Sequence, residues 1–370
     1  MTSPEKAAPQ ARHARRAIVP RATYRLQLNA SFTLRDATAL VPYLCDLGVS
    51  HVYCSPYLRA RPGSTHGYDI VDHNTLNPEI GDRDDLERFV AALRSHHMGH
   101  ILDFVPNHVG IMGADNAWWM DVLENGPASI YAPFFDIDWQ PINPALAGKV
   151  LVPVLGDHYG DVLERGELEP RFDAATGSLV VLYHEHRFPL DPRDYSSILQ
   201  RALTAARQDS LSDELRAEVS SLATAFGHLP ERGSVTPAAV EERNRDKEVH
   251  KRRLAALCAG HPALAEAMDA ATRTLAGRPG DAPSWNELHQ LLESQAYRLA
   301  YWRVASDEIN YRRFFDVNDL AALRMENEAV FEATHRLVLE LLAEDKVDGL
   351  RIDHTDGLYD PAGYLRRLQR

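Results

Sequence analysis

Residues 347–357 read VDGLRIDHTDG and place an arginine two positions before an aspartate at the end of a short apolar stretch. Side chains alternate faces along a strand, so Arg351 and Asp353 would point to the same side. A neighbouring guanidinium favours the ionised form of a carboxyl group and fixes its orientation, which would prepare Asp353 to act as a nucleophile. An isolated Arg-x-Asp pair is more often a structural ion pair at a strand end, so this stretch alone leaves both interpretations open.

Two further polar clusters follow expected strands. The sequence HGYD at residues 66–69 lies in a long loop after one such strand, and Asn107 and His108 follow the next strand. In a parallel sheet these groups would face the same rim as Asp353 and His354. A tyrosine ring can stack on a sugar, and His, Asn, Arg and Asp can hydrogen-bond its hydroxyl groups. The combination favours a carbohydrate ligand, although each residue taken alone is equally compatible with an ordinary loop or turn.

The elements that position these clusters alternate between strand and helix patterns. Thr33 and Asp36 resemble a capping box at the start of the first helix. Strands are expected at 22–28, 49–54, 100–105 and 347–352, and helices at 33–46, 84–96, 325–346 and 362–369. This alternation predicts parallel βα units, in which function is found at the carboxyl ends of the strands.

About two hundred residues interrupt this alternation and are expected to form an inserted subdomain. We expect a hairpin over 171–188, and helices over 197–226, 237–258, 262–275 and 285–306. The predicted organisation is a flexible tail at 1–20, two βα units and a third strand at 21–109, an aromatic and then helical insertion at 110–310, and helix, strand and helix at 311–370. Four βα units are half of the eight that close a barrel.

Composition excludes several classes of protein. The 370 residues carry 53 acidic against 40 basic side chains, a net charge of −13, which argues against a nucleic-acid partner. No apolar run is long enough to cross a membrane, and residues 1–16 lack the apolar core of a secretory signal. The three cysteines are too few for a disulfide framework and lack metal-site spacing, so a cytoplasmic location is expected.

The clusters carry a family resemblance. DFVPNH at 103–108 and GLRID at 349–353 resemble two signature regions of the α-amylase superfamily of glycoside hydrolases and transglycosylases, and HGY at 66–68 resembles the loop with its stacking tyrosine. Within that superfamily, GSTHGYD at 63–69, NYRRFFD at 310–316 and RIDHTDG at 351–357 are most similar to maltooligosyltrehalose synthases. The resemblance extends from about residue 21 to the last residue and corresponds to the N-terminal half of such an enzyme.

The resemblance implies an α/β fold, the N-terminal half (strands 1–4) of a (β/α)8 TIM barrel with a large, mostly helical insertion after strand 3. It also implies an intramolecular transglucosylation that converts the reducing-end α-1,4 linkage of a maltooligosaccharide to an α,α-1,1 linkage, as in trehalose biosynthesis. By resemblance, Asp353 is the nucleophile and Arg351 its orienting cation. The substrate-binding residues it implies are His66, Tyr68, Asp69, Asn107, His108, His354 and Asp356.

The family's general acid, a Glu, follows strand five, and a second Asp follows strand seven. A retaining mechanism needs such a second carboxyl group, and nothing in the setting of Glu79, Glu124 or Glu185 recommends them for it. We therefore expect the chain to be inactive alone and to need a complementary C-terminal half of the barrel. We expect no cofactor and no metal. Two alternatives remain open: an α-glucan hydrolase of the same superfamily, and a non-catalytic glucan-binding remnant.

Overall fold

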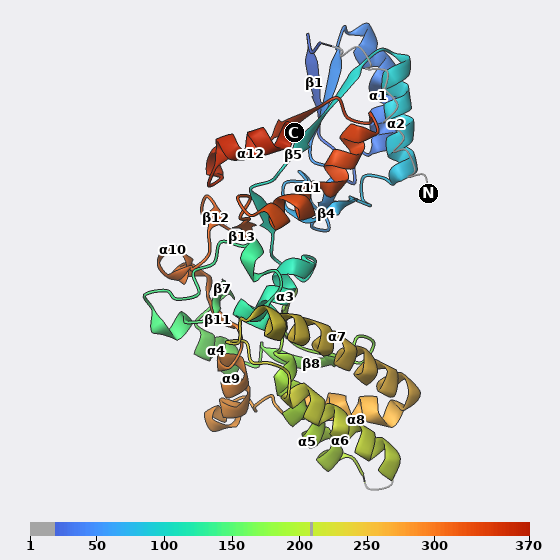
Figure 1. The fold of residues 1–370 in the computed structure, drawn as a ribbon. Coiled ribbons are helices and arrows are strands. Elements are labelled where there is room, and N and C mark those ends of the chain that lie inside the picture. The colour runs from blue at the N-terminus through green and yellow to red at the C-terminus, as the bar shows by residue number, and fades with distance from the viewer. Residues whose placement is uncertain (1–18, 208–209) are drawn as a thin grey trace, which may run out of the picture.

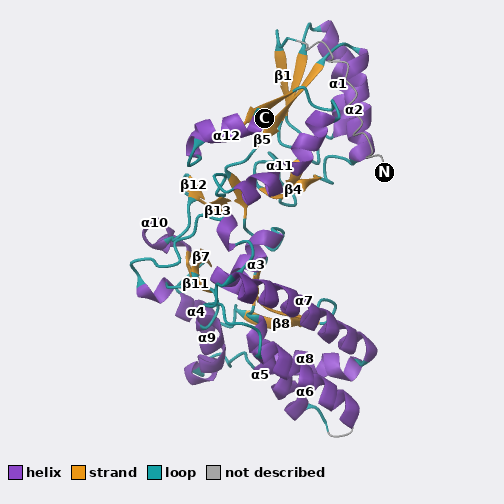
Figure 2. Ribbon diagram, in the orientation of Figure 1, coloured by secondary structure: helices purple, strands orange, loops and turns teal. Residues whose placement is uncertain are grey.

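The protein is described from a computed structural model that covers residues 19–207 and 210–370. The molecule is elongated, with a parallel sheet and its helices at one end and a mostly helical region at the other (Figure 1; Figure 2). The flexible tail predicted for residues 1–20 lies, except for its last two residues, outside the described part. In the described residues, no helix combines the length and apolarity that a membrane span needs.

A four-stranded parallel sheet carries the carboxyl ends on which the predicted site depends. Its order is β1-β2-β5-β14, with β1 at Thr23–Leu26, β2 at His51–Cys54, β5 at Gly99–Phe104 and β14 at Gly349–Ile352. In register, Tyr53 lies opposite Ile101, and Arg351 lies opposite Asp103. The four predicted strands therefore exist, and residues that are far apart in sequence meet at the carboxyl ends of these strands.

Three helices cover one face of this sheet. They are α1 (Leu34–Asp46), α2 (Arg83–Ser95) and α11 (Glu328–Ala343). The capping box predicted for α1 is present, because Thr33 and Asp36 each accept from the other's backbone N–H. Between sheet and helices lies an apolar core that includes Leu34, Val41, Leu86, Phe89, Leu102, Phe104 and Val338. Burial of these side chains fixes the strands that carry the polar rim.

The remaining elements connect and interrupt these units. The strands outside the parallel sheet are β3 (Leu58–Ala60), β4 (Ile70–Leu76), β6 (His108–Gly110), β7 (Val150–Leu155), β8 (Glu169–Asp173), β9 (Ser178–Tyr183), β10 (His186–Pro189), β11 (Tyr297–Tyr301), β12 (Arg313–Phe314) and β13 (Val317–Ala322). The other helices are α3 (Ala117–Asn125), α4 (Tyr159–Glu164), α5 (Tyr195–Ala205), α6 (Asp213–Gly227), α7 (Pro237–Gly260), α8 (Pro262–Arg273), α9 (Asn286–Glu293), α10 (Ala305–Glu308) and α12 (Pro361–Leu368). A second apolar core fills the inserted region.

Two helix predictions in the insertion are wrong in part. Residues 285–306 contain α9, but 297–301 form β11, which pairs in parallel with β7. Tyr297 and Leu299 alternate inward in that strand, a pattern that is hard to separate from a helix in so short a segment. Residues 197–226 form two helices, α5 and α6, with a break between them. The hairpin predicted over 171–188 is confirmed as β8 and β9, and β10 adds a third strand.

A small antiparallel sheet joins the insertion to the parallel sheet. Its order is β12-β13-β6, and only three residues separate the end of β5 from the start of β6. Ala322 lies opposite His108 in this pairing, so backbone hydrogen bonds attach the β12–β13 hairpin directly to the strand that carries His108. The sheet therefore connects the two chain segments that lie at the expected domain boundaries near residues 110 and 310.

Buried ion pairs stabilise the insertion, and Glu124 is central among them. Lys247 and Lys251 both contact its carboxylate. Burial alone would raise the pKa of Glu124, but the two ammonium groups outweigh it and lower that pKa to about 2. Glu124 is therefore ionised at neutral pH and cannot serve as a proton donor there.

Glu124→Gln should lower the free energy of unfolding by about 3 kcal/mol at neutral pH, because it removes the most buried of the carboxylates that pair with Lys247 and Lys251 and leaves them only Asp121 and the half-exposed Glu248. Since the folded-state pKa of Glu124 lies below its ordinary value, its stabilising effect is present above about pH 4.5 and is lost as the pH falls towards 2. Urea unfolding at pH 7 and pH 3 should show the difference shrinking at the lower pH. Glu218→Gln, in the exposed pair with Arg253, should cost under about 1 kcal/mol at either pH. An equal loss in both variants would contradict the argument.

Candidate active site

The Arg351–Asp353 pair has the geometry expected from the strand alternation. Arg351 Nη1 donates to Asp353 Oδ1 at 2.5 Å and to Asp103 Oδ1 at 2.9 Å. Burial by itself would lower the pKa of Arg351, but the hydrogen bonds to the two carboxylates outweigh it and raise that pKa above its ordinary value. The guanidinium therefore remains a cation that fixes the Asp353 carboxylate at the carboxyl end of β14.

Asp103 is the buried centre of a hydrogen-bond network that connects the carboxyl ends of the strands. Its side chain is fully buried, and its second oxygen accepts from the hydroxyl of Tyr53 at 2.6 Å and from that of Tyr68 at 2.5 Å. Arg25 donates to the Tyr68 hydroxyl at 3.1 Å. Burial and the hydrogen bond to Asp103 raise the pKa of Tyr68, so its hydroxyl stays protonated and donates. Side chains from β1, β2, β5, β14 and the 63–69 loop are thereby held together.

The 63–69 loop has a shape that only glycine permits at position 67. Gly67 has φ +79°, and a Cβ there would lie 2.5 Å from the carbonyl oxygen of Pro56. Tyr68 N–H donates to His66 Nδ1 at 3.0 Å. Asp69 accepts from the Ser64 hydroxyl at 2.5 Å and so braces its own loop. Tyr68 is directed into the network and His66 is exposed at the rim, while the Asp69 carboxylate is engaged inside the loop.

Asn107 and His108 are buried where β5 leads into β6. Asn107 Oδ1 accepts from Arg312 Nη1 at 3.2 Å, so its amide is used to contact the segment that precedes β12. His108 Nε2 has no hydrogen-bond partner among the described residues. Burial, reinforced by the neighbouring His354, lowers the pKa of His108 to about 3. His108 is therefore a neutral imidazole whose Nε2 is buried in this structure.

His354 and Asp356 follow the nucleophile candidate and differ in exposure. His354 has φ +48° and packs its ring against Phe314 at 4.8 Å and Phe315 at 5.0 Å between ring centroids. Asp356 is 88% exposed and its Oδ1 lies 3.5 Å from His354 Nδ1. The Phe314 ring also lies 4.3 Å from that of His108. The β12–β13 hairpin therefore lines this side of the rim with aromatic rings.

Sequence reasoning missed several members of the cluster. Arg25 and Tyr53 lie on expected strands. Because side chains alternate faces along a strand, their positions could have been used to predict that they belong to the same rim. Asp103 stood inside a recognised motif, but only the cross-strand register shows that Arg351 binds it. Phe314 also belonged to a recognised segment; its approach to His108 depends on the long-range pairing of β13 with β6, which has no local sequence signal.

Tyr68→Phe should lower the free energy of unfolding by about 1–2 kcal/mol, because it deletes the hydroxyl that Asp103 and Arg25 share. Thermal unfolding of this variant and of Tyr24→Phe gives the measurement and its control, since Tyr24 is 43% exposed on β1. Equal melting temperatures for the two variants would contradict the proposed place of Tyr68 in the network.

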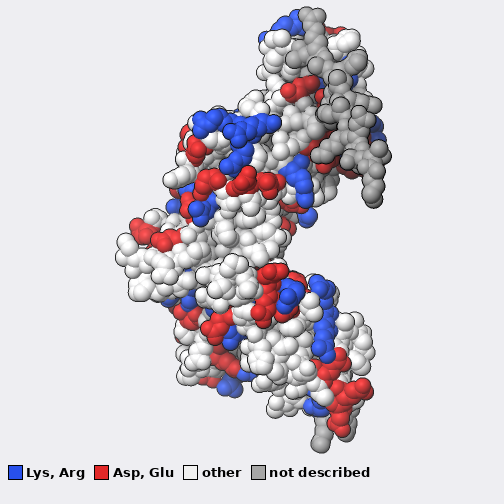
Figure 3. All heavy atoms as spheres, in the orientation of Figure 1, with Lys and Arg blue, Asp and Glu red and all other residues white. Residues whose placement is uncertain are grey.

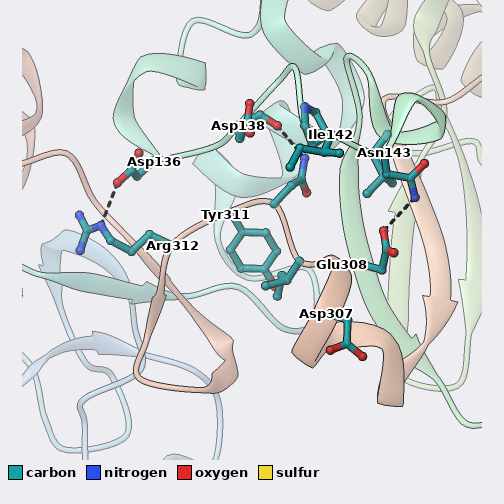
Figure 4. A pocket seen from close by; sticks show the side chains of 12 residues that line it. Asp136, Asp138, Ile142, Asn143, Asp307, Glu308, Tyr311 and Arg312 are labelled. Atoms are coloured by element: carbon teal, nitrogen blue, oxygen red, sulfur yellow. Dashed lines mark hydrogen bonds and ion pairs between the residues drawn. The ribbon is translucent and has the colours of Figure 1, made fainter.

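A cavity of about 630 Å³ lies beside the cluster, within the insertion. Figure 4 shows that Asp136, Asp138, Asn143, Asp307 and Glu308 surround it, with an ion pair between Asp136 and Arg312 and a hydrogen bond between Asn143 and Glu308. Arg312 is shared between this cavity and Asn107. In Figure 3 basic side chains gather over α12, and acidic side chains lie directly below them.

Comparison with known proteins gives consistent similarities. The family described as "Alpha amylase, catalytic domain" matches residues 30–161. The putative maltooligosyl trehalose synthase of Mycobacterium tuberculosis (strain ATCC 25618 / H37Rv) is 35% identical over 361 residues, which are 94% of this chain and 32% of that protein. The intracellular maltogenic amylase of Bacillus subtilis is 36% identical over only 100 residues, 27% of this chain and 16% of that protein.

The solved structure of maltooligosyltrehalose synthase from Arthrobacter ramosus aligns with a TM-score of 0.62 and 33% identity, covering 94% of this chain and 33% of that one. The chain thus spans about a third of the length of the curated synthases it matches. Residues 30–161 are thus similar to the α-amylase catalytic domain, and the chain is similar over 94% of its length to maltooligosyltrehalose synthases.

Proposed function

We propose that this chain carries the nucleophile of a maltooligosyltrehalose synthase, which isomerises the reducing-end α-1,4 linkage of a maltooligosaccharide to an α,α-1,1 linkage. The observation that carries the proposal is the Asp353 carboxylate, which Arg351 holds at the carboxyl end of β14. Tyr68, His66 and His108 lie at the same end of the sheet. A carboxylate fixed in this way beside an aromatic ring suits attack on a sugar.

The reaction is a double displacement at one anomeric carbon. Asp353 attacks C1 of the penultimate glucose as a general acid protonates O4 of the reducing-end glucose, which leaves. The displaced glucose then turns, and its anomeric hydroxyl attacks the same C1 while the former acid takes up the proton. Asp353 leaves unchanged, no water is consumed, and two inversions retain the α configuration.

The same geometry supports proposed roles for the other predicted residues. Tyr68 would stack under the sugar at the cleaved bond, and the exposed His66 would bind one of its hydroxyl groups. His108 would add a second such bond where substrate binding makes its buried Nε2 accessible. His354 and Asp356 would contact the displaced glucose. The proposed contributions of Asn107 and Asp69 are indirect, since Asn107 binds Arg312 and Asp69 binds Ser64.

For the fold we propose half of a (β/α)8 barrel, strands 1–4, completed by further βα units. Within the described residues β1 and β14 each pair with one neighbour, and both are more exposed than β2 and β5. The synthases it resembles are about three times longer. Strands that pair with these two edges would act as the complementary partner and supply the general acid and the second Asp.

Glu79, Glu124 and Glu185 do not suit the role of general acid. Glu124 is held ionised by Lys247 and Lys251. Glu79 accepts from the Gly63 N–H, and backbone hydrogen bonding lowers the pKa of Glu185. A general acid needs a raised pKa, so we propose that the strands that complete the barrel supply this residue.

The test is a reducing-end assay on maltopentaose with product identification. We expect loss of reducing ends, with formation of a trehalose-ended isomer, when the chain is combined with the separately expressed C-terminal part of a related synthase, and no loss with the chain alone. A gain of reducing ends would indicate hydrolysis instead. No reaction in the combination, with both parts folded and associated, would contradict the proposed function.

A further inference from the structure

Gln27, which directly follows β1, holds the loop at residues 63–69 through its side-chain amide. Its Nε2 donates to the carbonyl oxygen of Thr65 at 3.1 Å and to that of His66 at 3.2 Å. At the other end of the amide, Arg25 Nη1 donates to Gln27 Oε1 at 2.6 Å. A guanidinium can only donate and a carbonyl oxygen can only accept, so this is the one orientation of the amide that satisfies all three partners.

The position of Gln27 follows from the alternation of side chains along the strand. Leu26 and Leu28 are buried in the core beneath the sheet, so Gln27 between them faces the opposite side, where the loop lies. Arg25 faces that side too, and so does Asn29, whose amide also donates to the loop. Gln27 is the middle one of three polar side chains that contact the loop from one strand end.

The loop satisfies its own N–H groups but leaves two carbonyl groups for Gln27. Gly67 N–H donates to the Ser64 hydroxyl at 3.1 Å, and Tyr68 N–H donates to His66 Nδ1 at 3.0 Å. Among the described residues, no backbone N–H donates to the carbonyl oxygen of Thr65 or of His66. Side-chain amides from the end of β1 therefore supply the hydrogen bonds that fix this part of the loop.

His66 and Tyr68 are the loop residues that the proposed reaction uses. His66 Nδ1 accepts from a backbone N–H, so the proton of the neutral imidazole lies on Nε2, where it can be donated at the exposed rim. Gln27 binds the carbonyl group of His66 itself, two residues before Tyr68. A shift of this carbonyl group moves both side chains, and an error of about 1 Å at a reacting centre can cost about 10²-fold in rate.

We propose that Gln27 is a positioning residue for the reaction. Its amide, oriented by Arg25, fixes the loop carbonyl groups and thereby sets where His66 and Tyr68 meet the sugar at the cleaved bond. Gln27 itself makes no contact with the sugar in this role. The inference rests on the proposed function, because that function gives His66 and Tyr68 their task.

Two substitutions at position 27 separate the parts of this role. Gln27→Glu keeps the shape and the acceptor for Arg25, but it loses both donors and turns a carboxylate oxygen toward two carbonyl oxygens. Gln27→Met keeps the length of the side chain and removes donors and acceptor alike; it carries the test if the glutamate variant does not fold. The control is Gln200→Glu, the same substitution at an exposed position of α5.

Hydrogen exchange of the 370-residue chain alone tests the anchoring of the loop. In Gln27→Glu the amides of Gly67 and Tyr68 should exchange at least about tenfold faster than in wild type, because the loop opens more easily without its two hydrogen bonds. The amides of β2 and β5 should exchange as before, and Gln200→Glu should match wild type throughout. Unchanged exchange at Gly67 and Tyr68 in both position-27 variants would overturn the proposal.

Kinetics of the combined preparation test the effect on the reaction. Gln27→Glu should lower kcat for maltopentaose about 10–100-fold and change KM by less than about threefold, because it disturbs the geometry at the cleaved bond more than the binding of the other glucose units. Gln200→Glu should stay within about twofold of wild type in both constants. A kcat for Gln27→Glu equal to that of wild type would contradict the positioning role.

A Tyr68→Ala background separates positioning from a general loss of structure. There Gln27→Glu should cost less than about fivefold in kcat, because one of the two groups that it positions is gone and coupled residues are not additive. A cost as large as in the wild-type background would rule the proposal out. Absence of isomerisation by the wild-type combination would contradict the proposed function and this role with it, whereas the exchange result, which needs no reaction, still shows whether Gln27 anchors the loop.

Discussion

Asp353→Asn should reduce isomerisation of maltopentaose by at least about 10⁴-fold in the combined preparation and leave the fold intact. The asparagine keeps the shape of the side chain and can still accept from Arg351 Nη1, but its neutral amide cannot form the glycosyl-enzyme bond. Loss of a nucleophile removes the route itself, so the effect is far larger than that of a weakened contact. Initial rates of trehalose-ended product formation provide the measurement.

The control is Asp84→Asn, the same substitution at an exposed position of α2. It should leave the rate within about twofold, since surface substitutions away from special features have small effects. Circular dichroism and association with the C-terminal part should be unchanged for both variants. Substantial activity in Asp353→Asn would show that another group forms the intermediate.

Asp103→Ala has the second largest expected effect, and it acts on both stability and rate. The substitution leaves Tyr53, Tyr68 and Arg351 without their shared buried acceptor, which should cost about 3–5 kcal/mol of unfolding free energy. Arg351 then loses one of the two carboxylates that fix it. A misplacement of Asp353 by about 1 Å would reduce the rate by about 10²-fold.

Asp103→Asn separates the two contributions. It retains an acceptor oxygen for the tyrosine hydroxyls but presents an N–H₂ group or a neutral oxygen to Arg351, so it should recover part of the stability and less of the rate. Urea unfolding and kcat measured on the same samples give the comparison. If Asp103→Ala were as stable and active as wild type, Asp103 would not be a positioning residue.

The parallel sheet could be predicted because its information is local. Each strand has its own apolar alternation, and the capping box at Thr33 and Asp36 marks α1 directly. The pairing of Arg351 with Asp353 likewise follows from a spacing of two. These features need no knowledge of what lies across the fold.

The parts that sequence could not reveal depend on long-range pairing. The sequence of β11 resembles the continuation of a helix. It forms a strand because it pairs with β7, some 145 residues earlier in the chain. Asp103 looked like one member of a motif, whereas its burial among Tyr53, Tyr68 and Arg351 depends on the order of three strands. Arg312 was one arginine in a recognised segment, and Asn107, to which it donates, lies 205 residues earlier in the chain.

The most direct test of Asp353 as the nucleophile is to trap the glycosyl-enzyme intermediate. A glucosyl fluoride that reacts quickly and is released slowly suits this purpose, since fluoride leaves without a proton from a general acid. After incubation with the combined preparation, peptide mass mapping should show one added glycosyl group on Asp353, and none in Asp353→Asn. A glycosyl group on a different carboxylate, or turnover without an adduct on the peptide that contains Asp353, would contradict the account.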